Sequence, residues 1–212
     1  MRILFAFLTV LLFCSAVSLP ARADDRAVVQ AAPEPAPPDA QPVPQAAPPA
    51  MNREARLDKL FADLKRERNE KAAERIAGII WSEWSQSGSA SIDLMMQWSQ
   101  KALENQKFDV ALDFLDQVVT LQPAYAEGWN RRATVHFMMK NYGKSMSDID
   151  HTLQLEPRHF GALSGLAQIM TVTGRKQSAL EAWQKVLAIY PMLRSAQDQV
   201  GTLSEELAGE GI

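Results

Sequence analysis

Apolar and small residues recur along the second half of the chain with a fixed period. Pro123, Pro157 and Pro191 mark this period, and they are the only prolines after residue 50. Eight positions before each proline stands a bulky apolar residue, and twelve positions before it stands a small one. Within each period the apolar positions step by three and four, which places them on one face of a helix. The pattern therefore predicts helical units of equal length.

Each unit contains two apolar stripes with a short break between them. In the second unit the first stripe includes Trp129, Ala133 and Phe137, and the break lies at residues 140–143. In the third unit the break contains Gly174, which suits the positive φ angle that follows many helix C-termini. Proline cannot extend the second helix, because it lacks a backbone N–H and biases the preceding residue toward extended geometry. Each unit is thus predicted to be a helix, a tight turn, a second helix and a proline stop.

Weaker helical stripes flank the three units. We expect a degenerate helical hairpin within residues 51–91, where Ser89 stands in place of the proline. A one-faced apolar stripe begins at Leu193, and it predicts a capping helix and tail over residues 194–212. The predicted fold class is all-α, a solenoid of antiparallel helix hairpins with a C-terminal capping helix.

This arrangement resembles the tetratricopeptide repeat (TPR) family. The units 92–125, 126–159 and 160–193 carry family residue types at Trp129 (fourth place), Ala133 and Ala167 (eighth), Ala111 and Ala179 (twentieth), Trp183 (twenty-fourth) and the three prolines (thirty-second). The tyrosine usual at the eleventh place is missing, and the chain has instead Ala102, His136 and Met170. The resemblance implies a TPR-like solenoid in which the first helix of each hairpin lines a concave groove.

The first 23 residues have the pattern of a secretory signal peptide. Arg2 supplies the positive charge of the N-terminal region, and residues 3–17 are almost wholly apolar. Small residues precede an expected cleavage site after Ala23. The apolar run is shorter than the ~20 residues of a membrane-spanning helix, which favours cleavage over an uncleaved anchor. A lipoprotein signal at Cys14 is disfavoured, because Phe13 stands where the lipid-attachment motif needs a small residue. We therefore predict export to the periplasm.

Residues 24–50 have a different composition from the rest of the chain. They hold eight of the twelve prolines, with alanine and glutamine between them. Such a segment cannot form a packed core, so we expect a disordered tether rather than a specific proline-rich ligand. The folded region is then expected to begin near Met51, and its length suffices for one domain with a substantial core.

Charge and cysteine content exclude some classes of function. Removal of Arg2 and Arg22 with the signal would leave 20 basic residues against 25 acidic ones, a formal charge of −5. That balance argues against a general nucleic-acid binder, which would need a basic surface. The one cysteine would leave with the signal, which excludes disulfides and thiolate metal sites from the mature chain.

Candidate chemistry is sparse. The sequence has no phosphate-binding loop, dinucleotide fingerprint, zinc-protease motif or nucleophile elbow. We predict packing or surface roles for His136, His151 and His159, because no acidic residue stands at metal-ligand spacing on the same helical face. Gly161 and Gly165 favour close packing of one hairpin on the next. We predict no enzymatic activity, no metal and no cofactor.

The TPR resemblance also implies which residues face the groove. The fifth, ninth and twelfth places of the three first helices hold Met96, Gln100 and Leu103, then Asn130, Thr134 and Phe137, then Ser164, Gln168 and Thr171. Arg131 belongs to the cluster Trp129-Asn130-Arg131-Arg132, for which we weigh ion pairs between helices against contact with an anionic partner. TPR domains that grip a carboxylate chain end use lysine and asparagine at the first two places, and only Asn130 matches. The groove therefore suits an amphipathic helix or an extended peptide.

The signal, tether and C-terminal repeat block together resemble periplasmic TPR proteins of alphaproteobacteria. The segments 129–132 and 158–161 carry part of this similarity. It implies a non-enzymatic scaffold that binds a segment of an envelope protein and supports envelope integrity or surface-protein assembly. Membrane contact would come only through the partner or an uncleaved signal. Two alternatives stay open: an assembly chaperone for a secretion or cytochrome system, and a cell-wall glycan binder or enzyme.

Overall fold

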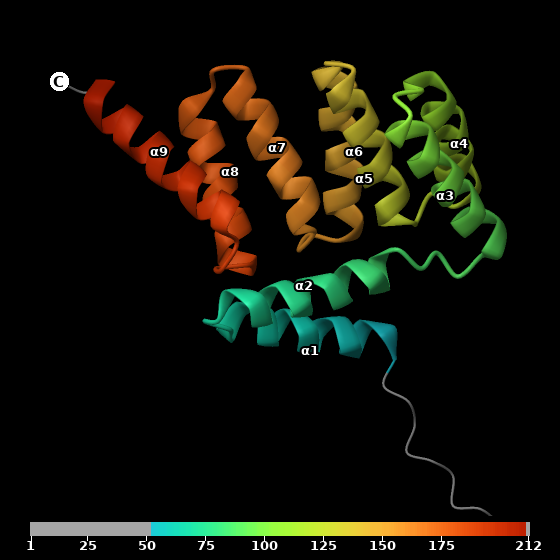
Figure 1. Cartoon of the computed structure of the whole chain (residues 1–212), viewed down its shortest axis with the longest axis horizontal. Helices are drawn as coiled ribbons and strands as arrows, with labels where there is room; N and C mark the ends of the chain where they lie inside the picture. The colour runs from blue at the N-terminus through green and yellow to red at the C-terminus, as the bar shows by residue number, and fades with distance from the viewer. Residues whose placement is uncertain (1–51, 211–212) are drawn as a thin grey trace, which may run out of the picture. The chain divides into compact units, whose positions relative to one another are not determined.

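A computed structural model describes residues 52–210, and the predicted all-α fold class is confirmed for them (Figure 1). The helices of this described part are α1 (Arg53–Arg66), α2 (Glu70–Trp84), α3 (Ala90–Glu104), α4 (Phe108–Leu121), α5 (Ala126–Met138), α6 (Tyr142–Leu155), α7 (Phe160–Val172), α8 (Lys176–Ile189) and α9 (Arg194–Glu210). None of them is long and apolar enough to cross a membrane. The expected signal peptide and tether lie outside the described residues.

The hairpins α3–α4, α5–α6 and α7–α8 follow one another side by side, and α9 packs on α8 (Figure 1). Small residues allow the two helices of each hairpin to approach closely. Ala111 and Ala179 are fully buried, and Ser145 at the equivalent position is 1% exposed. The Ser145 hydroxyl donates a 2.8 Å hydrogen bond to the Ala133 carbonyl on the partner helix. The small residues twelve positions before each proline are thus the contact points within the hairpins.

The turns between paired helices repeat as closely as the helices do. Gln106, Lys140 and Gly174 occupy the same place in successive units, and their φ angles are 56°, 60° and 73°. The next residue of each turn donates its backbone N–H to a carbonyl five positions earlier, in the pairs Lys107–Ala102, Asn141–His136 and Arg175–Met170. This is a Schellman ending, which requires a left-handed residue. The positive φ predicted for Gly174 is confirmed, whereas the first two turns hold residues that favour this conformation less.

The hairpin α1–α2 does not stack on α3–α4 as a fourth repeat would. It lies along the ends of the repeat hairpins, on the side of the proline turns (Figure 1). Its apolar residues share one core cluster with residues of α7, α8 and α9. The segment 51–91 thus contains the expected hairpin, but it is not a further repeat of the row, because its apolar face is buried against the third repeat and the C-terminal helix.

Aromatic contacts attach this hairpin to the repeats. Trp84 is 4% exposed, and its indole stacks on the His159 imidazole with 4.0 Å between centroids and 9° between planes. Arg158 reaches back from the second proline turn, where its guanidinium lies 4.3 Å from the centre of the Phe61 ring. The same guanidinium donates a 2.6 Å charged hydrogen bond to Asp58. Residues beside Pro157 thus hold both helices of the hairpin.

The segment that joins α2 to α3 is held by the first proline turn. The Tyr125 hydroxyl donates to the Ser85 carbonyl at 3.0 Å, and the Gln122 amide donates to the Ser87 carbonyl at 2.7 Å. The Ser87 hydroxyl in turn donates to Asp93 at 2.6 Å. These bonds satisfy polar groups of the connecting segment and set where the hairpin leaves the repeats.

Candidate functional site

The first helices of the repeats line two neighbouring pockets. One pocket, of about 280 Å³, lies between α5 and α7 and is called here the α5–α7 pocket. Its walls are mainly apolar, and they are formed by Ala133, Phe137, Ile149, Gly161, Ala162, Gly165 and Trp183. Polar side chains complete the lining: Asn130, Thr134, Ser145, Ser164 and Gln168. A hollow of this kind can take an apolar side chain and hydrogen-bond the chain that carries it.

The second pocket, of about 200 Å³, lies between α3 and α5 and is called here the α3–α5 pocket. It is lined by Trp81, Ser99, Gln100, Leu103, Leu115, Glu127, Asn130, Arg131, Thr134 and Val135. Asn130 and Thr134 line both pockets, so the two hollows adjoin across α5. Trp81 comes from α2, which means that the N-terminal hairpin contributes directly to the groove.

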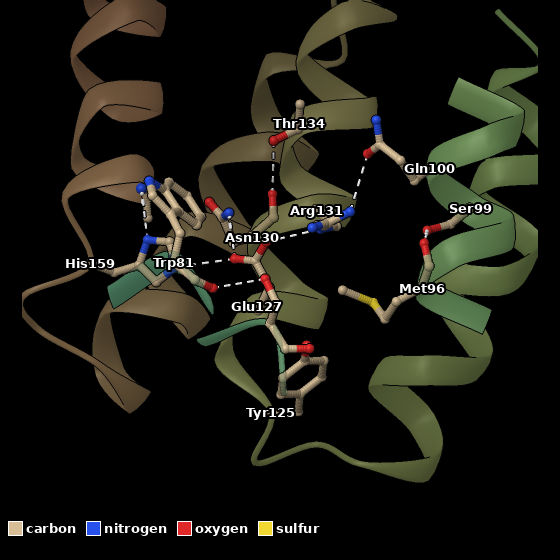
Figure 2. A network of polar contacts seen from close by, with 12 residues as sticks. Trp81, Met96, Ser99, Gln100, Tyr125, Glu127, Asn130, Arg131, Thr134 and His159 are labelled. Carbon is tan, nitrogen blue, oxygen red and sulfur yellow. Dashed lines mark hydrogen bonds and ion pairs between the residues drawn. The ribbon is translucent and has the colours of Figure 1, made fainter. Parts of the chain in front are cut away.

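A buried carboxylate organises the start of α5 (Figure 2). Glu127 is 2% exposed, and its Oε2 accepts a 2.9 Å hydrogen bond from the Asn130 amide. Arg131 Nε donates to the other oxygen, Oε1, at 2.9 Å. Nε2 of the fully buried His159 lies 3.3 Å from Oε2. Three partners thus surround a charge that would be costly to bury alone.

The His159 ring links this carboxylate to the helix that follows. The backbone N–H of Ala162 donates to His159 Nδ1 at 3.1 Å, so the imidazole caps the N-terminus of α7. Because Nδ1 accepts this bond, the ring proton resides on Nε2, which donates it to Glu127. His159 therefore has a packing role, as the sequence predicted, and it joins α7, α5 and the Trp84 ring.

Burial and hydrogen bonding act in opposite directions on the Glu127 carboxyl. Burial favours the neutral acid and raises the pKa, whereas the hydrogen bonds from His159 and Arg131 and the positive charge of Arg131 lower it. The partners outweigh burial, and the pKa of Glu127 lies below its ordinary value. The carboxylate is therefore ionised at neutral pH and acts as a structural anchor at the edge of the α3–α5 pocket.

The neighbouring arginines are held by acidic and amide groups. Besides Glu127, Arg131 contacts the Gln100 side chain at 3.1 Å (Figure 2). Arg132 makes two bonds to Asp148, at 2.9 and 2.7 Å, and a third to Asp116 of α4 at 2.8 Å. These contacts support the ion-pair interpretation of the cluster 129–132 rather than contact with an anionic partner.

The structure distributes the ten predicted groove residues over several environments. Five of them line the α5–α7 pocket: Asn130, Thr134, Phe137, Ser164 and Gln168. Three others line the α3–α5 pocket: Gln100, Leu103 and Arg131. Met96 is 5% exposed and belongs to the core of the first repeat. Thr171 lines neither pocket, and its hydroxyl donates to the Ala167 carbonyl of its own helix at 2.9 Å.

Sequence reasoning missed the contribution of Trp81. A Cβ atom added at Gly161 would lie 2.6 Å from the Trp81 ring, so glycine is needed there for the indole to seat. At Gly165 the same atom would lie 3.4 Å from Ile149 of α6, an ordinary contact. The predicted close packing therefore does not require glycine at position 165, whereas Gly161 makes room for the N-terminal hairpin. The two glycines were visible in the sequence, but the partner of the first was not.

The remaining histidines do not form a chemical centre. Burial lowers the pKa of His136, and its Nδ1 has no hydrogen-bond partner within the described part of the chain. His151 is exposed, and its ring stacks on Trp129 at 4.3 Å. Across residues 52–210 no group of three or more His, Cys, Asp or Glu side chains is placed to hold a metal ion.

Comparison with known proteins relates the chain to two curated sequences. No family model matches it. It is 57% identical over 154 residues to a TPR repeat-containing protein of Rhizobium etli, and the match covers 73% of this chain and 76% of that protein. It is 30% identical over 97 residues to the small glutamine-rich tetratricopeptide repeat-containing protein 2 of Saccharomyces cerevisiae. That match covers 46% of this chain and 28% of the yeast protein.

Solved structures with the same arrangement of hairpins are more distant in sequence. The Sgt2 TPR domain from Aspergillus fumigatus has a TM-score of 0.54 at 16% identity, over 58% of this chain and 83% of that domain. The first TPR of Spaghetti (RPAP3), bound to the HSP90 peptide SRMEEVD, has a TM-score of 0.53 at 20% identity, over 55% of this chain and 93% of that domain. MamA has a TM-score of 0.52 at 16% identity, over 66% of this chain and 79% of the MamA chain. At these sequence identities the similarity shows a shared fold only.

Proposed function

Because the chain belongs to the tetratricopeptide repeat proteins, we propose that it is a non-enzymatic scaffold that binds a segment of a partner protein in the groove of α3, α5 and α7. The observation that carries this proposal is the α5–α7 pocket, an apolar hollow with a polar rim in the middle of the groove. The relation to the Rhizobium protein supports the family, and the neighbour that holds a peptide supports the mode of binding.

The chemistry of the pocket selects an apolar anchor. Phe137, Ile149 and Trp183 offer apolar surface, and Gly165 adds no side chain to the space between them. Burial of one bulky apolar side chain there would supply about 1.5–3 kcal/mol. The partner segment would therefore carry a leucine, isoleucine, methionine or phenylalanine at the position that enters the pocket.

The rim of the pocket offers hydrogen bonds to the rest of the segment. Gln168 makes no hydrogen bond to any residue of the described chain, so both ends of its amide can meet a peptide backbone. Thr134 is exposed, and its hydroxyl donates to the Asn130 carbonyl one turn earlier, which leaves it able to accept. An extended peptide or a helix end could use both groups.

The groove favours an internal segment of the partner over a carboxylate chain end. No lysine is found among the residues that line either described pocket. Arg131, the cation of the α3–α5 pocket, is already bonded to Glu127 and Gln100. A free carboxylate would also approach the negative charge of Glu127, which disfavours it.

We propose that the partner is an envelope protein and that binding takes place in the periplasm. The support is the N-terminal sequence, which has a positive end, an apolar run and small residues before Ala23. Residues 1–30 fused to a phosphatase that is active only outside the cytoplasm should give an active enzyme in cells. An inactive fusion, with the processed form absent, would contradict the proposed location.

The groove proposal is tested by a blocking substitution with a matched control. Thr134→Trp would fill the entrance of the α5–α7 pocket, whereas Met138→Trp adds the same ring on the same helix at a residue that lines neither pocket. Both chains are used to capture proteins from an envelope extract, which are then identified by mass spectrometry. We expect a partner that the wild type and Met138→Trp retain and that Thr134→Trp loses. Equal capture by both variants would contradict binding in the groove.

Peptides from the captured partner then test the anchor. A set of overlapping peptides should contain one that binds the wild-type chain and fails to bind Thr134→Trp. Replacement of its single bulky apolar residue by alanine should weaken binding by about 1.5–3 kcal/mol, roughly 10- to 150-fold. A peptide that binds through its C-terminal carboxylate instead would contradict the proposed chemistry.

A further inference from the structure

The first repeat ends in an apolar surface that faces away from the second. This surface is called here the end face, and its centre is formed by Leu94, Trp98, Val110 and Phe114. Leu94 and Val110 are each 42% exposed, and Trp98 is 47% exposed. The Trp98 and Phe114 rings contact each other with 5.4 Å between centroids. Such a cluster of large apolar side chains is unusual at the surface of a monomer.

The second repeat shows what normally covers this surface. Arg132 and Asp148 stand one repeat period after Trp98 and Phe114. They pair with each other at 2.7 Å, the Asp148 side chain is 4% exposed, and Arg132 also bonds to Asp116 of the preceding hairpin. The equivalent face of the second repeat is therefore an interface with α4.

Small residues occupy other equivalent positions in the later repeats. Gly128 stands one repeat period after Leu94, and a Cβ atom there would lie 2.8 Å from Val118 of α4. Ala162 stands one further period along the chain and is 1% exposed. A preceding hairpin leaves no room for a large side chain at this position. Leucine fits in the first repeat because α1–α2 packs elsewhere and leaves the end face open.

The two ends of the repeat row differ in composition. At the C-terminal end, α9 buries Ala196 and Leu203 against the third repeat. Asp198, Glu205 and Glu206 are exposed on this helix. A polar outer surface is what a terminal cap requires. Because α9 offers no apolar complement, head-to-tail stacking of two chains would leave the end face poorly covered.

The end face is complementary to itself in charge. Lys101 and Lys107 lie beside its apolar centre, and Asp109 and Asp113 lie along α4. All four are exposed, and none forms an ion pair with another residue in the range 52–210. A two-fold axis can place each set of charges on one copy near the opposite set on the other. A hollow of about 420 Å³ beside Trp98 and Phe114 offers room for side chains of the second copy.

We propose that the end face is a dimer interface and that its occupant is a second copy of this chain related by a two-fold axis. Trp98 and Phe114 form the apolar centre, and the lysines and aspartates form the rim. The contact replaces the missing fourth repeat, and it is closed, because a two-fold interface uses the same surface on both copies. The grooves of the two copies lie outside this interface and stay available to partners.

The test introduces into the first repeat the arginine–aspartate pair that the second repeat has at the equivalent positions. Trp98→Arg with Phe114→Asp places the residue types of the second repeat at the same register of the first, so folding should be preserved. The chains are isolated from cells that express the full-length sequence and compared by sedimentation velocity over a range of concentrations. We expect a wild-type dimer whose dissociation constant rises roughly 30-fold or more in the double variant. Ile79→Ser removes an equally exposed apolar residue from α2 and should leave the dimer unchanged.

A charge exchange tests the symmetry of the contact. One variant carries Lys101→Glu and Lys107→Glu, and the other carries Asp109→Lys and Asp113→Lys. Each should dimerise more weakly alone than in an equimolar mixture, where opposite charges meet again. The proposal is overturned by a wild type that stays monomeric at every concentration, by a dimer that both variant sets leave intact, by assemblies that grow without limit, or by a mixture that gains nothing.

Discussion

The N-terminal hairpin α1–α2 and the repeat hairpin α5–α6 are similar as local structures and differ in what holds them. Both are antiparallel pairs of amphipathic helices. The repeat hairpin lies between two similar neighbours, and Ser145 and Gly128 give close contact at fixed positions of the period. The N-terminal hairpin is attached instead through Trp81, Trp84 and Phe61, whose rings contact Phe160, His159 and Arg158 beside the second proline turn. The comparison shows that the repeat pattern predicts stacking only for the three hairpins that have it in full, and not for α1–α2.

Loss of the Trp84 ring should have the largest effect on this comparison. Trp84→Ala removes a buried indole that contacts His159 and Phe160, which should lower the free energy of unfolding by about 3–5 kcal/mol. The hairpin should then detach before the repeats unfold, and proteases should cut the segment 85–89. Urea unfolding followed by circular dichroism and limited proteolysis measure both effects. Ile79→Ala on the same helix is exposed in the wild type and should change stability by less than about 0.5 kcal/mol.

Neutralisation of Glu127 should have the next largest effect, and it should depend on pH. Glu127→Gln leaves His159 and Arg131 without their charged acceptor, which should cost about 1–3 kcal/mol at neutral pH. Because the folded pKa of Glu127 is lowered, its contribution is complete above the unfolded pKa of about 4.3 and is lost as pH falls through the folded value. The unfolding free energies of the two chains should therefore begin to converge as the pH falls below about 4.3. A difference in unfolding free energy that does not change with pH would show that the charge of Glu127 is not the source of the stabilisation.

The two glycines of α7 separate the hairpin contact from the contact between repeats. Gly161→Ala places a methyl group against the Trp81 ring and should destabilise the protein by about 1–3 kcal/mol. Gly165→Ala meets Ile149 at an ordinary distance, and it should stabilise α7 by up to about 1 kcal/mol through helix propensity. Thermal unfolding of both variants measures the difference. Equal effects at the two positions would mean that Trp81 does not seat on Gly161 in solution.

The same contrast explains what could be predicted from the sequence. The proline period indicated the hairpins, their turns and five residues of the α5–α7 pocket, because repeat interfaces reuse the same positions. Met96 was assigned to the groove from its place in the unit; most of its side chain lies in the core of the first repeat, and it also lines a hollow beside Gln100 and Arg131. Trp81 was missed because it reaches Gly161 from a distant part of the chain, and no period relates the two. Glu127 and His159 were visible as polar residues, but their contact depends on how the second and third repeats meet.

The smallest predicted effect concerns the turn between α5 and α6, whose left-handed residue occupies the same place in every repeat. Lys140 has a φ of 60°, a conformation that costs a residue with a side chain about 1–2 kcal/mol more than glycine. Lys140→Gly should therefore raise the unfolding free energy by about 1 kcal/mol, because glycine is less strained there but more flexible when unfolded. Gly174→Ala at the equivalent turn should lower stability by a similar amount, and chemical denaturation measures both. A loss of stability in Lys140→Gly would contradict the shared geometry of the turns.

The central claim is that α1–α2 lies across the proline turns and leaves the first repeat open, and cross-linking tests it most directly. In a Cys14→Ser background, one chain carries Asp58→Cys and Arg158→Cys, whose side chains are in contact in the wild type. A second chain carries Ile79→Cys and Trp98→Cys, which would be neighbours if α1–α2 stacked as a further repeat. A short bismaleimide, followed by protease digestion and mass spectrometry, should join the first pair within one chain and leave the second unjoined. Efficient linkage of the second pair without the first would contradict the account.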